Sequence, residues 1–353
     1  MKGDYTLIVP ALDRTGPVSV AVDIGLAARD AGWRVRILYL STTVPRDDLG
    51  FVSELRKFQF ADLWRLSGVV HTHCLRPDIL GLPLSWNRKI ILVTTLHNFF
   101  LIDVGFDKPR FFVEAAWRLW KRSLRGFDVV ACISEAMKRY YSRCLPDHQF
   151  QMAYNFRGRQ TETQVDSATL LWIENRRASG DLVLVFVGAL SERKNIRGLI
   201  SALPGAASIS LIVCGQGPLQ QEIMAIVKNL GLQNRVRFEG QVLSPSNITR
   251  HVDALVLPSY AEGFPLAVLE AASVGVPALL SNIAVHRELA HLGFGKTFDH
   301  RRFSDFFQVA QDLRNEIPAP SVDLEALWSS KFSPRVGFAQ YENLISNAIK
   351  VKK

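Results

Sequence analysis

The stretch ALVLPSYAEGFPLAVLEAA, residues 254–272, sets the architecture of the second half of the chain. Its first part, 254–258, is a continuous apolar run of the kind that forms a buried strand in a parallel sheet. Pro265 suits the first position of a helix, where its missing N–H group would be unpaired in any case. Gly275 and Pro277 are expected to end that helix. The segment therefore predicts a strand, a short glycine-containing loop and the start of a helix.

The same alternation of apolar strands and helices recurs along the chain. The expected strands are 5–12, 33–40, 66–72, 90–96, 128–133 and 150–154 in the first half, and 182–189, 209–214, 235–239, 254–258 and 277–281 in the second. Strands that are apolar throughout and separated by helices are typical of parallel sheets with helices on both faces. The sequence therefore predicts an α/β chain with two doubly wound, Rossmann-like sheets that face each other across a ligand cleft.

A polar, broken stretch at residues 157–180 separates the two series of strands, and the pattern starts afresh at residue 182. We place the domain boundary there, with a first domain over 1–160 and a second over 161–333. A helix is expected at about 334–351. It should pack against one of the two domains, and we favour the first.

Composition narrows the class of protein. The 353-residue chain is 48% hydrophobic and has no low-complexity tract, which excludes a mainly disordered protein. It has no run long and apolar enough to span a membrane and no secretory signal, so we expect a cytoplasmic protein. The four cysteines are widely separated and indicate neither a disulfide framework nor a zinc site. Residues 1–160 hold nearly all of the net charge of +9. This bias favours an anionic partner for the first domain, although a generally basic surface would show it too.

Two acidic residues flank the start of the helix at Pro265. Glu262 lies in the loop before it, and Glu270 lies about one and a half turns inside it. The free N–H groups of Leu266 and Ala267 would form an anion site at the helix N-terminus. A carboxylate among small apolar residues is costly without a partner. Glu270 therefore indicates a ligand with paired hydroxyl groups, unless it pairs with a Lys or Arg or reaches solvent.

An adjacent pair of cations, Arg193 and Lys194, marks the junction of the strand at 182–189 with the next helix. A guanidinium fork beside a point charge suits a diphosphate. Cations at a helix start oppose the helix dipole, and an anionic ligand would remove that conflict. The alternative is a solvated basic pair.

These segments together resemble the retaining glycosyltransferases of family 4, which have the GT-B fold. Glu262 and Glu270 form an E-x7-E pair within EGFPLAVLEA. The continuation GVPALLSN at 275–282, with HRE shortly after it, is similar to the segment that follows this pair in the family. FVGALSERKN at 186–195 is similar to the family motif V-G-R-L-x-x-x-K-N/G, with Ala189 in place of its arginine.

The resemblance implies a role for each matched residue. Glu270 would hold the ribose hydroxyls of a nucleotide sugar, and Glu262 would lie near the donor sugar as a catalytic residue. Arg193 would take the place of the missing arginine and act in catalysis with Lys194 by binding the diphosphate. The loop residues that would bind sugar and diphosphate are Gly263, Phe264 and Leu266.

The first half matches the family in order and spacing. Gly16 is the one glycine left in the loop after the first strand, where the family binds the donor, and a structural turn is the alternative. His97 follows the strand at 90–96 and corresponds to a histidine beside the transferred sugar. The resemblance therefore implies a catalytic-site residue that orients donor or acceptor by hydrogen bonding rather than by proton transfer. A structural histidine is again the alternative. His71 and His73 share one strand face. They lack a third metal ligand nearby and are expected to be structural or to line the acceptor site.

Further segments carry weaker signals. CGQGPL at 214–219 is expected to close a strand–helix turn, VRFEGQV at 236–242 is similar to the segment that lines the base pocket, and Ser134 is a helix N-cap. Residues 110–126 form an amphipathic basic stretch. It is either a core helix with a solvated basic face or a helix that lies on an anionic membrane. Its apolar residues at helical spacing are Val113, Ala116, Trp117, Trp120 and Leu124.

With the resemblance, the sequence predicts a retaining glycosyltransferase that uses a nucleotide-diphosphate sugar, with UDP- and GDP-sugars favoured. The acceptor would be a saccharide or lipid-linked saccharide. The setting would be bacterial O-antigen, capsule or exopolysaccharide assembly at the inner face of the cytoplasmic membrane. The chain has no D-x-D pair, and we expect no metal, no further cofactor and no nucleic-acid partner.

A sugar-nucleotide epimerase of similar fold and an inactive donor-binding partner protein are the alternatives. A nicotinamide-dependent dehydrogenase lacks support, because no G-x-G-x-x-G follows the first strand.

Overall fold

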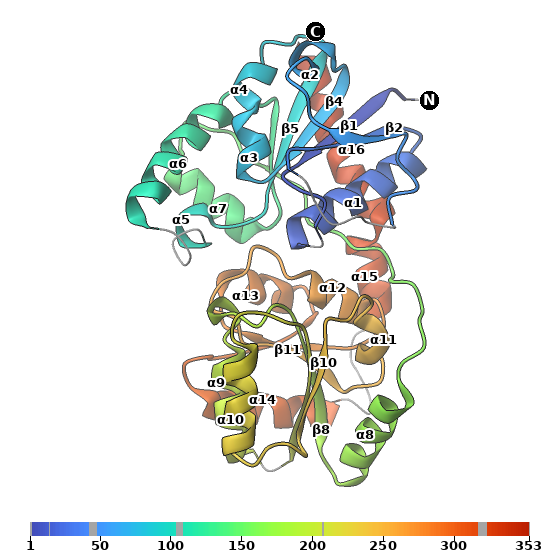
Figure 1. Ribbon diagram of the computed structural model, residues 1–353, viewed down its shortest axis with the longest axis vertical. Helices are drawn as coiled ribbons and strands as arrows, with labels where there is room; N and C mark the ends of the chain where they lie inside the picture. Colours follow the sequence, from blue (N-terminus) through green and yellow to red (C-terminus); the bar gives the residue numbers. More distant parts are fainter. Residues whose placement is uncertain are drawn as a thin grey trace. The chain divides into compact units, whose positions relative to one another are not determined.

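The computed structural model divides the chain into two compact units (Figure 1). Unit 1 comprises Met1–Gly158 and Phe332–Lys353, and unit 2 comprises Arg159–Lys331. The residues that the structure describes are 2–13, 15–41, 48–103, 109–206, 208–316 and 323–352. Each unit has a parallel sheet of its own.

The sheet of unit 1 has seven strands in the order β3-β2-β1-β4-β5-β6-β7, and each pair of neighbours is parallel. The strands are β1 (Asp4–Val9), β2 (Arg34–Tyr39), β3 (Glu54–Lys57), β4 (Gly68–His73), β5 (Ile90–Leu96), β6 (Val129–Cys132) and β7 (Gln151–Met152). The helices are α1 (Gly16–Asp30), α2 (Asp62–Arg65), α3 (Leu75–Ile79), α4 (Gly81–Leu84), α5 (Phe100–Asp103), α6 (Arg110–Leu124), α7 (Glu135–Cys144) and α16 (Pro334–Lys352). The order of the strands reverses at β1, and the loops that bind ligands in such sheets follow the carboxyl ends of the strands.

Alternate residues of the central strands face opposite sides of this sheet. Thr95 of β5 meets α16, whose Tyr341 hydroxyl lies 3.0 Å from its Oγ1. The neighbouring Thr94 donates instead to Asp78 of α3, at 2.7 Å. Helix α16 therefore covers one face together with α1, whereas α3, α4 and α6 cover the other. The helix expected at 334–351 is α16, and it packs within unit 1.

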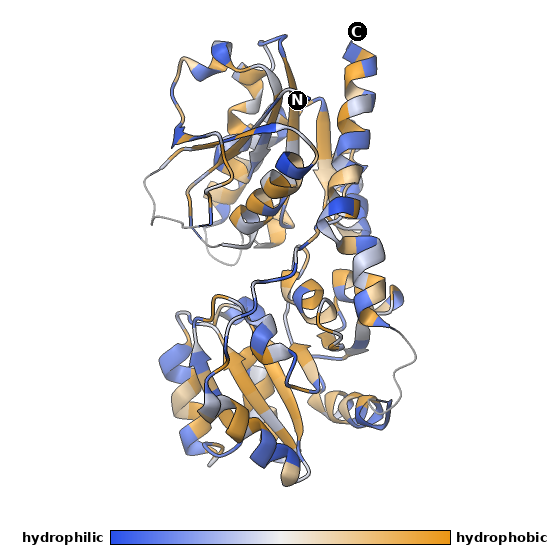
Figure 2. Cartoon of the chain, turned by 90° about the vertical axis from the view of Figure 1, so that its right-hand side faces the viewer, coloured by the Kyte–Doolittle hydropathy of each residue, from blue (hydrophilic) through white to orange (hydrophobic). Residues whose placement is uncertain are grey.

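The core of unit 1 lies on both faces of its strands. Figure 2 shows hydrophobic residues along much of the strands, whereas the helices carry hydrophobic and hydrophilic residues side by side. One buried cluster forms where β1, β2, β4 and β5 meet α2 and α4, and it consists of Ile8, Leu38, Leu63, Leu66, Val70, Leu84, Ile90 and Leu92. Burial of such side chains is the main driving force for folding.

The sheet of unit 2 has six parallel strands in the order β10-β9-β8-β11-β12-β13. They are β8 (Leu182–Val187), β9 (Ile209–Cys214), β10 (Val236–Gly240), β11 (Ala254–Leu257), β12 (Ala278–Ser281) and β13 (Gly295–Phe298). The helices are α8 (Ser167–Ala178), α9 (Ile196–Ala202), α10 (Gln220–Asn229), α11 (Ser246–Thr249), α12 (Leu266–Ala272), α13 (Ala284–His291), α14 (Phe303–Glu316) and α15 (Leu324–Phe332), with 3-10 turns η2 (Glu192–Lys194) and η3 (Leu203–Gly205). Strands β8 and β11 are neighbours at the centre, so the loops after them lie side by side.

The strands predicted from apolar runs are present within a few residues of their expected bounds. The sequence does not predict two edge strands, β3 and β13. Their sequences, ELRK and GKTF, contain few apolar residues. Edge strands face solvent, and charged side chains there discourage pairing with other chains.

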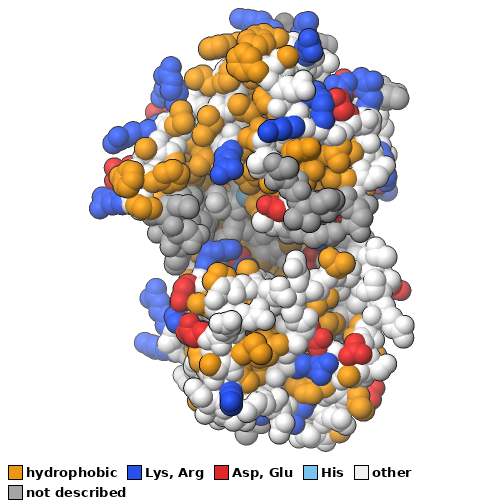
Figure 3. Space-filling model, viewed as in Figure 1, with side chains coloured by type: hydrophobic (Ala, Val, Ile, Leu, Met, Phe, Trp, Pro, Cys, Tyr) orange, Lys and Arg blue, Asp and Glu red, His pale blue; other side chains and the backbone are white. Residues whose placement is uncertain are grey.

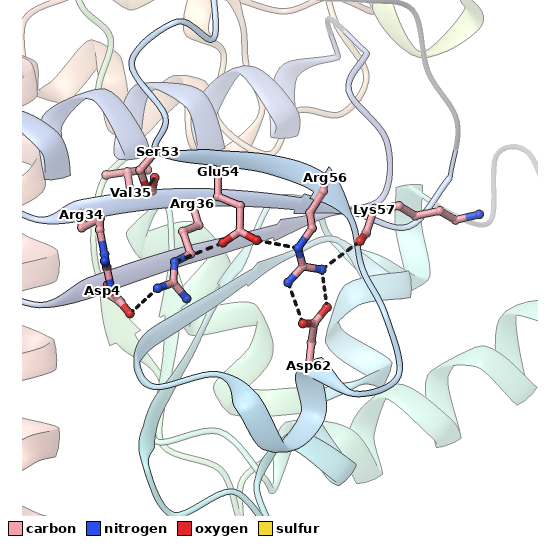
Figure 4. Close-up of polar contacts among 9 residues, drawn as sticks. All are labelled: Asp4, Arg34, Val35, Arg36, Ser53, Glu54, Arg56, Lys57 and Asp62. Carbon is pink, nitrogen blue, oxygen red and sulfur yellow. Dashed lines mark hydrogen bonds and ion pairs between the residues drawn. The ribbon is translucent and has the colours of Figure 1, made fainter.

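The edge of the unit 1 sheet carries an interlocked set of charges (Figure 4). Its members are Asp4 on β1, Arg34 and Arg36 on β2, Glu54 and Arg56 on β3, and Asp62 on α2. Asp62 is buried and accepts two bonds from the Arg56 guanidinium, at 2.7 and 2.8 Å, and one from the Gln59 backbone N–H at 2.7 Å. Burial tends to raise the pKa of Asp62, but these donors outweigh it and lower the pKa. Asp62 thus anchors β3 to α2.

We predict that Asp62→Ala lowers the free energy of unfolding by about 1.5–3 kcal/mol, because hydrogen bonds to a charged group are lost and Arg56 loses its partner. The pKa is lowered in the folded chain, so this stabilisation is present above about pH 4 and disappears as the pH falls through the folded value. Urea titrations at pH 7 and pH 3 measure both effects. The control is Asp30→Ala, which removes the exposed pair with Arg29. An equal loss in the control would contradict the prediction.

Candidate functional site

The two cations predicted to bind an anion lie in a turn after β8. Arg193 and Lys194 belong to η2, and Asn195 ends this turn in the left-handed region with a φ of 50°. The turn is hydrogen-bonded to the loop after β11. The Tyr260 N–H donates to the Arg193 carbonyl at 2.9 Å, and Asn195 Nδ2 donates to the Pro258 carbonyl at 3.2 Å. The two loops therefore form one structure at the carboxyl edge of the sheet.

Glu262 is the centre of this structure, and its side chain is buried. Its carboxylate accepts from Lys194 Nζ at 2.6 Å, from Ser259 Oγ at 2.7 Å and from Arg193 Nη1 at 3.3 Å. The same Arg193 nitrogen donates to the Ala261 carbonyl at 2.8 Å. Burial tends to raise the pKa of Glu262, but Lys194 and Arg193 outweigh it and hold the pKa at about 2. The carboxylate is ionised at neutral pH, and the three charged groups carry a net charge of +1.

The glycines at this edge serve close packing of the backbone. A Cβ at Gly215 would lie 1.9 Å from the carbonyl oxygen of Gly188, and one at Gly217 would lie 2.5 Å from the carbonyl oxygen of Leu190. The Gly188 N–H donates to the Cys214 carbonyl at 3.0 Å. The segment CGQGPL therefore closes the turn after β9, as predicted.

Behind Glu262 lies a buried layer to which the sequence reading gave no role. Ser281, the last residue of β12, donates from Oγ to the Ser259 carbonyl at 2.6 Å. His286 of α13 lies with Nδ1 2.9 Å from Ser281 Oγ and 3.0 Å from the Ser281 carbonyl. Burial lowers the pKa of His286 to about 4, so this ring is neutral. Ser281 ends the apolar strand β12, and Ser259 lies two residues after the apolar strand β11. A polar residue at the end of an apolar run was the sequence signal that could have identified them.

Helix α12 begins one residue later than predicted and ends before the expected stop. Pro265 is its N-cap, with a ψ of 104°, and the helix runs over Leu266–Ala272, short of Gly275. The backbone of Pro265 is extended, so this residue lies just before the first helical turn and is not its first residue. The first N–H groups of a helix have no partner within the helix, and Leu266 and Ala267 occupy those positions, half-buried.

The remaining predicted donor-binding residues of unit 2 surround the start of α12. Gly263 and Phe264 lie in the loop before it and are buried. Glu270 is buried on α12, where Ser273 Oγ donates to its backbone carbonyl at 2.7 Å. The structure thus brings Arg193, Lys194 and Glu262 into direct contact and places the other predicted residues on the segment that follows Glu262.

Gly16 and His97 belong to unit 1, where they follow β1 and β5 at the carboxyl edge of the sheet. Gly16 opens α1, and a Cβ there would meet nothing within 4 Å, so close packing does not require this glycine. His97 is half-buried, and its Nε2 lies 2.8 Å from Nδ1 of the buried His73. His71 contacts the Tyr5 hydroxyl and Thr95 Oγ1, both at 2.8 Å, and is structural.

Helix α6 is packed into unit 1 by the apolar stripe predicted for it. Val113, Trp120 and Leu124 are buried, and Trp120 Nε1 donates to the buried Asp78 at 2.9 Å. Burial raises the pKa of Asp78 to about 6. Most of the stripe therefore packs into the core, while Ala116 and Trp117 are half-buried. Ser134 caps α7 by accepting from the Met137 N–H at 3.0 Å, as expected.

Neither a metal-binding cluster nor a membrane-spanning helix is found among the described residues. Within these residues, no group of three or more His, Cys, Asp or Glu side chains is placed to hold a metal ion. None of the helices described is both long enough and apolar enough to cross a bilayer.

We predict that Lys194→Met lowers the free energy of unfolding by about 3 kcal/mol, because it leaves a buried carboxylate with a weaker set of partners. The folded pKa of Glu262 is lowered, so the stabilisation is present above about pH 4.3 and is lost as the pH falls toward 2. Denaturant unfolding between pH 7 and pH 3 measures the effect. Arg197→Met, which removes an exposed cation paired with Glu192 and Glu222, is the control. A loss in Lys194→Met no larger than in this control would disprove the role of the pair.

Comparisons with known proteins agree with this fold. Residues 7–156 match the family model described as Glycosyltransferase Family 4, and residues 172–301 match that described as Glycosyl transferases group 1. The chain is 26% identical over 282 residues to an O-antigen biosynthesis glycosyltransferase, WclY of Escherichia coli. The aligned residues cover 79% of each protein.

Solved structures share the fold over nearly the whole chain. HepE of Anabaena in complex with UDP has a TM-score of 0.76 at 17% identity and covers 98% of this chain and 100% of that one. The HepE complex with UDP-glucose has a TM-score of 0.75 at 17% identity, with 98% and 99% covered. Sucrose-phosphate synthase of Thermosynechococcus elongatus has a TM-score of 0.78 at 16% identity, with 99% of both chains covered. The two family models, one over each parallel-sheet unit, show that the chain belongs to the glycosyltransferases of family 4 and has the GT-B fold.

Proposed function

We propose that this glycosyltransferase moves a sugar from a nucleotide-diphosphate sugar to an acceptor hydroxyl and retains the anomeric configuration. One observation carries the proposal. Arg193 and Lys194 converge on Glu262 at the carboxyl edge of two adjacent strands, next to the start of α12. Ligands of doubly wound sheets bind at that edge, and the net positive charge suits a diphosphate.

The cations would act by stabilising the departing diphosphate. Negative charge develops on the leaving group as the bond to the sugar breaks. Arg193 offers a planar fork for two oxygens, and Lys194 offers a point charge. Both are held before any ligand arrives, because each is bonded to Glu262. Preorganised charges of this kind are a large source of catalytic power.

The other donor contacts follow the family resemblance. We propose that Glu270 binds the ribose hydroxyls and that Glu262 lies near the donor sugar. We assign contacts with the sugar and diphosphate to Gly263, Phe264 and Leu266. In unit 1, we propose that Gly16 contacts the donor and that His97 orients donor or acceptor by hydrogen bonding. The departing diphosphate can itself accept the proton of the acceptor hydroxyl, so the mechanism needs no separate general base. Because Arg193 and Lys194 would supply the positive charge that stabilises the diphosphate, we propose that it uses no metal ion and no further cofactor.

The relatives favour a UDP-sugar and a role in bacterial surface polysaccharide assembly. HepE was solved with UDP and with UDP-glucose, and WclY is named an O-antigen biosynthesis glycosyltransferase. We propose the same donor class for this chain, with a GDP-sugar as second choice, and a saccharide or lipid-linked saccharide as acceptor. We propose that the enzyme works in the cytoplasm, because such glycans are assembled there from nucleotide sugars.

The test begins with the nucleotide. UDP, GDP, ADP and dTDP are compared for their effect on the melting temperature, because a ligand that binds the folded state raises it by mass action. Transfer from the sugar form of the selected nucleotide is then measured with EDTA and with Mg²⁺, and we expect equal rates. An anomeric coupling constant in the product that matches the donor supports retention. Epimerised donor without an acceptor would instead indicate the epimerase.

We predict that Arg193→Ala lowers kcat by about 10²–10³-fold, the usual cost of losing one preorganised donor to the transition state. Lys194 still holds Glu262 in this variant, so the fold should persist, and the melting temperature checks it. Arg197→Ala is the matched control, since its exposed guanidinium pairs with Glu192 and Glu222. Near-normal turnover in Arg193→Ala would refute the assignment.

We further propose that unit 1 docks on an anionic membrane surface beside α6. The buried stripe of α6 is unavailable, but Phe111, Phe112 and Leu119 are exposed on its outer side. Figure 3 shows hydrophobic and basic side chains together over this helix. The exposed arginines of α6 and its C-cap are Arg110, Arg118, Arg122 and Arg125. Aromatic residues among cations are typical of surfaces that bind anionic lipid.

We predict that the double variant Phe111→Ser, Phe112→Ser binds vesicles with phosphatidylglycerol at least about tenfold more weakly than the parent protein, because two aromatic side chains no longer insert. Sedimentation with vesicles measures it, and binding should fall with salt. The control is Leu171→Ser, which alters an exposed leucine of unit 2. Equal binding of parent and double variant, or equal binding to neutral phosphatidylcholine, would count against this surface.

A further inference from the structure

His73 is a buried histidine to which the proposed reaction gives no role. It is the last residue of β4 and has no exposed surface, and its Nδ1 lies 2.8 Å from Nε2 of His97. The two rings are stacked, with centroids 5.1 Å apart and planes 29° from parallel. Strands β4 and β5 pair in register up to His73 and Thr95, so the contact joins the ends of two neighbouring strands.

His71 holds the ring of His73 through a second stacking contact. Their centroids lie 4.4 Å apart, with planes 30° from parallel. Both nitrogens of His71 are occupied, Nδ1 by the Tyr5 hydroxyl and Nε2 by Thr95 Oγ1. His71 therefore fixes the ring plane of His73 but offers it no hydrogen bond. His73 Nε2 is buried and has no hydrogen-bond partner in the described part of the chain.

Both rings of the His73–His97 pair are neutral near pH 7. Burial lowers the pKa of His97 to about 3 and lowers the pKa of His73 well below its usual value. A neutral imidazole has one N–H donor and one lone pair. The 2.8 Å contact therefore contains one proton, and either ring can be the donor.

The surroundings of His73 distinguish the two arrangements. If His97 donated from Nε2, His73 would carry its own proton on Nε2, as a buried N–H without an acceptor. If His73 donates from Nδ1, its Nε2 is a buried lone pair instead. Buried N–H groups without a partner are rarer in native proteins than buried acceptors without one. An unsatisfied buried polar group lowers the stability of the folded state by about 1–3 kcal/mol. Donation from His73 to His97 is therefore favoured.

We propose that His73 is a positioning residue that donates from Nδ1 to His97 and so holds the proton of His97 on its Nδ1. The hydrogen bond at one ring nitrogen decides which tautomer a histidine adopts. His97 then presents an N–H donor to a substrate oxygen and has no free lone pair with which to remove a proton. The inference rests on the proposed function, which places His97 beside the sugar. It makes His97 a hydrogen-bond donor to a sugar oxygen and excludes it as general base.

The tautomer can be read without an activity assay. Two-bond ¹⁵N–¹H correlation spectra report which nitrogen of each histidine ring is protonated, and His97→Ala identifies the His97 signals. We expect a protonated Nδ1 and an unprotonated, hydrogen-bonded Nε2 in wild-type His97. A protonated Nε2 in that ring overturns the proposal.

Two variants test the source of the tautomer. In His73→Leu we expect the His97 signals to move toward the Nε2–H form, since the donor is gone. His71→Asn is the matched control, because it removes the ring stacked on His73 but neither partner of the bond between His73 and His97. A shift in the control as large as in His73→Leu would show that packing alone sets the tautomer and would overturn the proposal.

Kinetics test whether His73 acts through His97. We predict that His73→Leu lowers kcat by about 10–100-fold, part of the 10²–10³-fold that a preorganised donor supplies, with little change in the donor KM. His73→Asn should restore most of kcat, because its amide can donate from the position of Nδ1. In a His97→Ala background, His73→Leu should cause no further loss. Equal losses in both backgrounds would show a purely structural role and overturn the proposal.

The outcomes separate this inference from the proposed function. Full activity in His97→Ala would remove His97 from the reaction, whereas the spectra would still decide its tautomer. Melting temperatures show whether each variant folds. If His73→Leu does not fold, the wild-type spectrum and His73→Asn still decide the matter.

Discussion

The buried carboxylate of Glu262 fixes the geometry on which the proposed donor site of unit 2 depends. It binds Lys194, Arg193 and Ser259, and these residues come from the two loops that follow the adjacent strands β8 and β11. A second set of bonds, through Tyr260 and Asn195, closes the same junction with backbone atoms. The spacing of the two cations is therefore set by the protein itself. A ligand that needs this spacing does not have to order the loops when it binds.

Nearby cations account for the different pKa values of two buried carboxyl groups of this chain. Asp78 in unit 1 and Glu262 in unit 2 are both buried. Asp78 accepts from Thr72, Thr94 and Trp120, all neutral donors, and burial raises its pKa to about 6. Glu262 contacts two cations, and its pKa is about 2. Asp78 suits a structural role that ties α6 to the sheet, whereas Glu262 keeps its charge over the physiological range of pH.

The sequence predicted the central strands and the cation pair because both have strong local signals. Continuous apolar runs mark strands buried on both faces, and adjacent cations at a helix start are unusual. The edge strand β3 was missed because its alternating charged residues pair with β2 and α2, a set of partners that only the folded chain defines. Other features were missed because they depend on contacts between segments that are distant in the sequence. The bond between His73 and His97 links residues 24 apart in the sequence, and no local pattern predicts it. Pro265 was placed one residue inside α12 because propensity alone does not distinguish an N-cap from a first helical residue.

Arg193 and Lys194 hold Glu262 unequally, and this difference bears on how a diphosphate would enter. Lys194 Nζ is 2.6 Å from the carboxylate, and its side chain is 13% exposed. Arg193 Nη1 is 3.3 Å away, and its side chain is 34% exposed. A phosphate that drew Lys194 away would leave Glu262 poorly compensated, at a cost of several kcal/mol. Arg193 has five N–H donors and can turn part of its fork toward a ligand while one N–H stays on the Ala261 carbonyl. We therefore infer that Arg193 bonds the phosphate oxygens first, whereas Lys194 maintains the loop and contributes its charge from a greater distance.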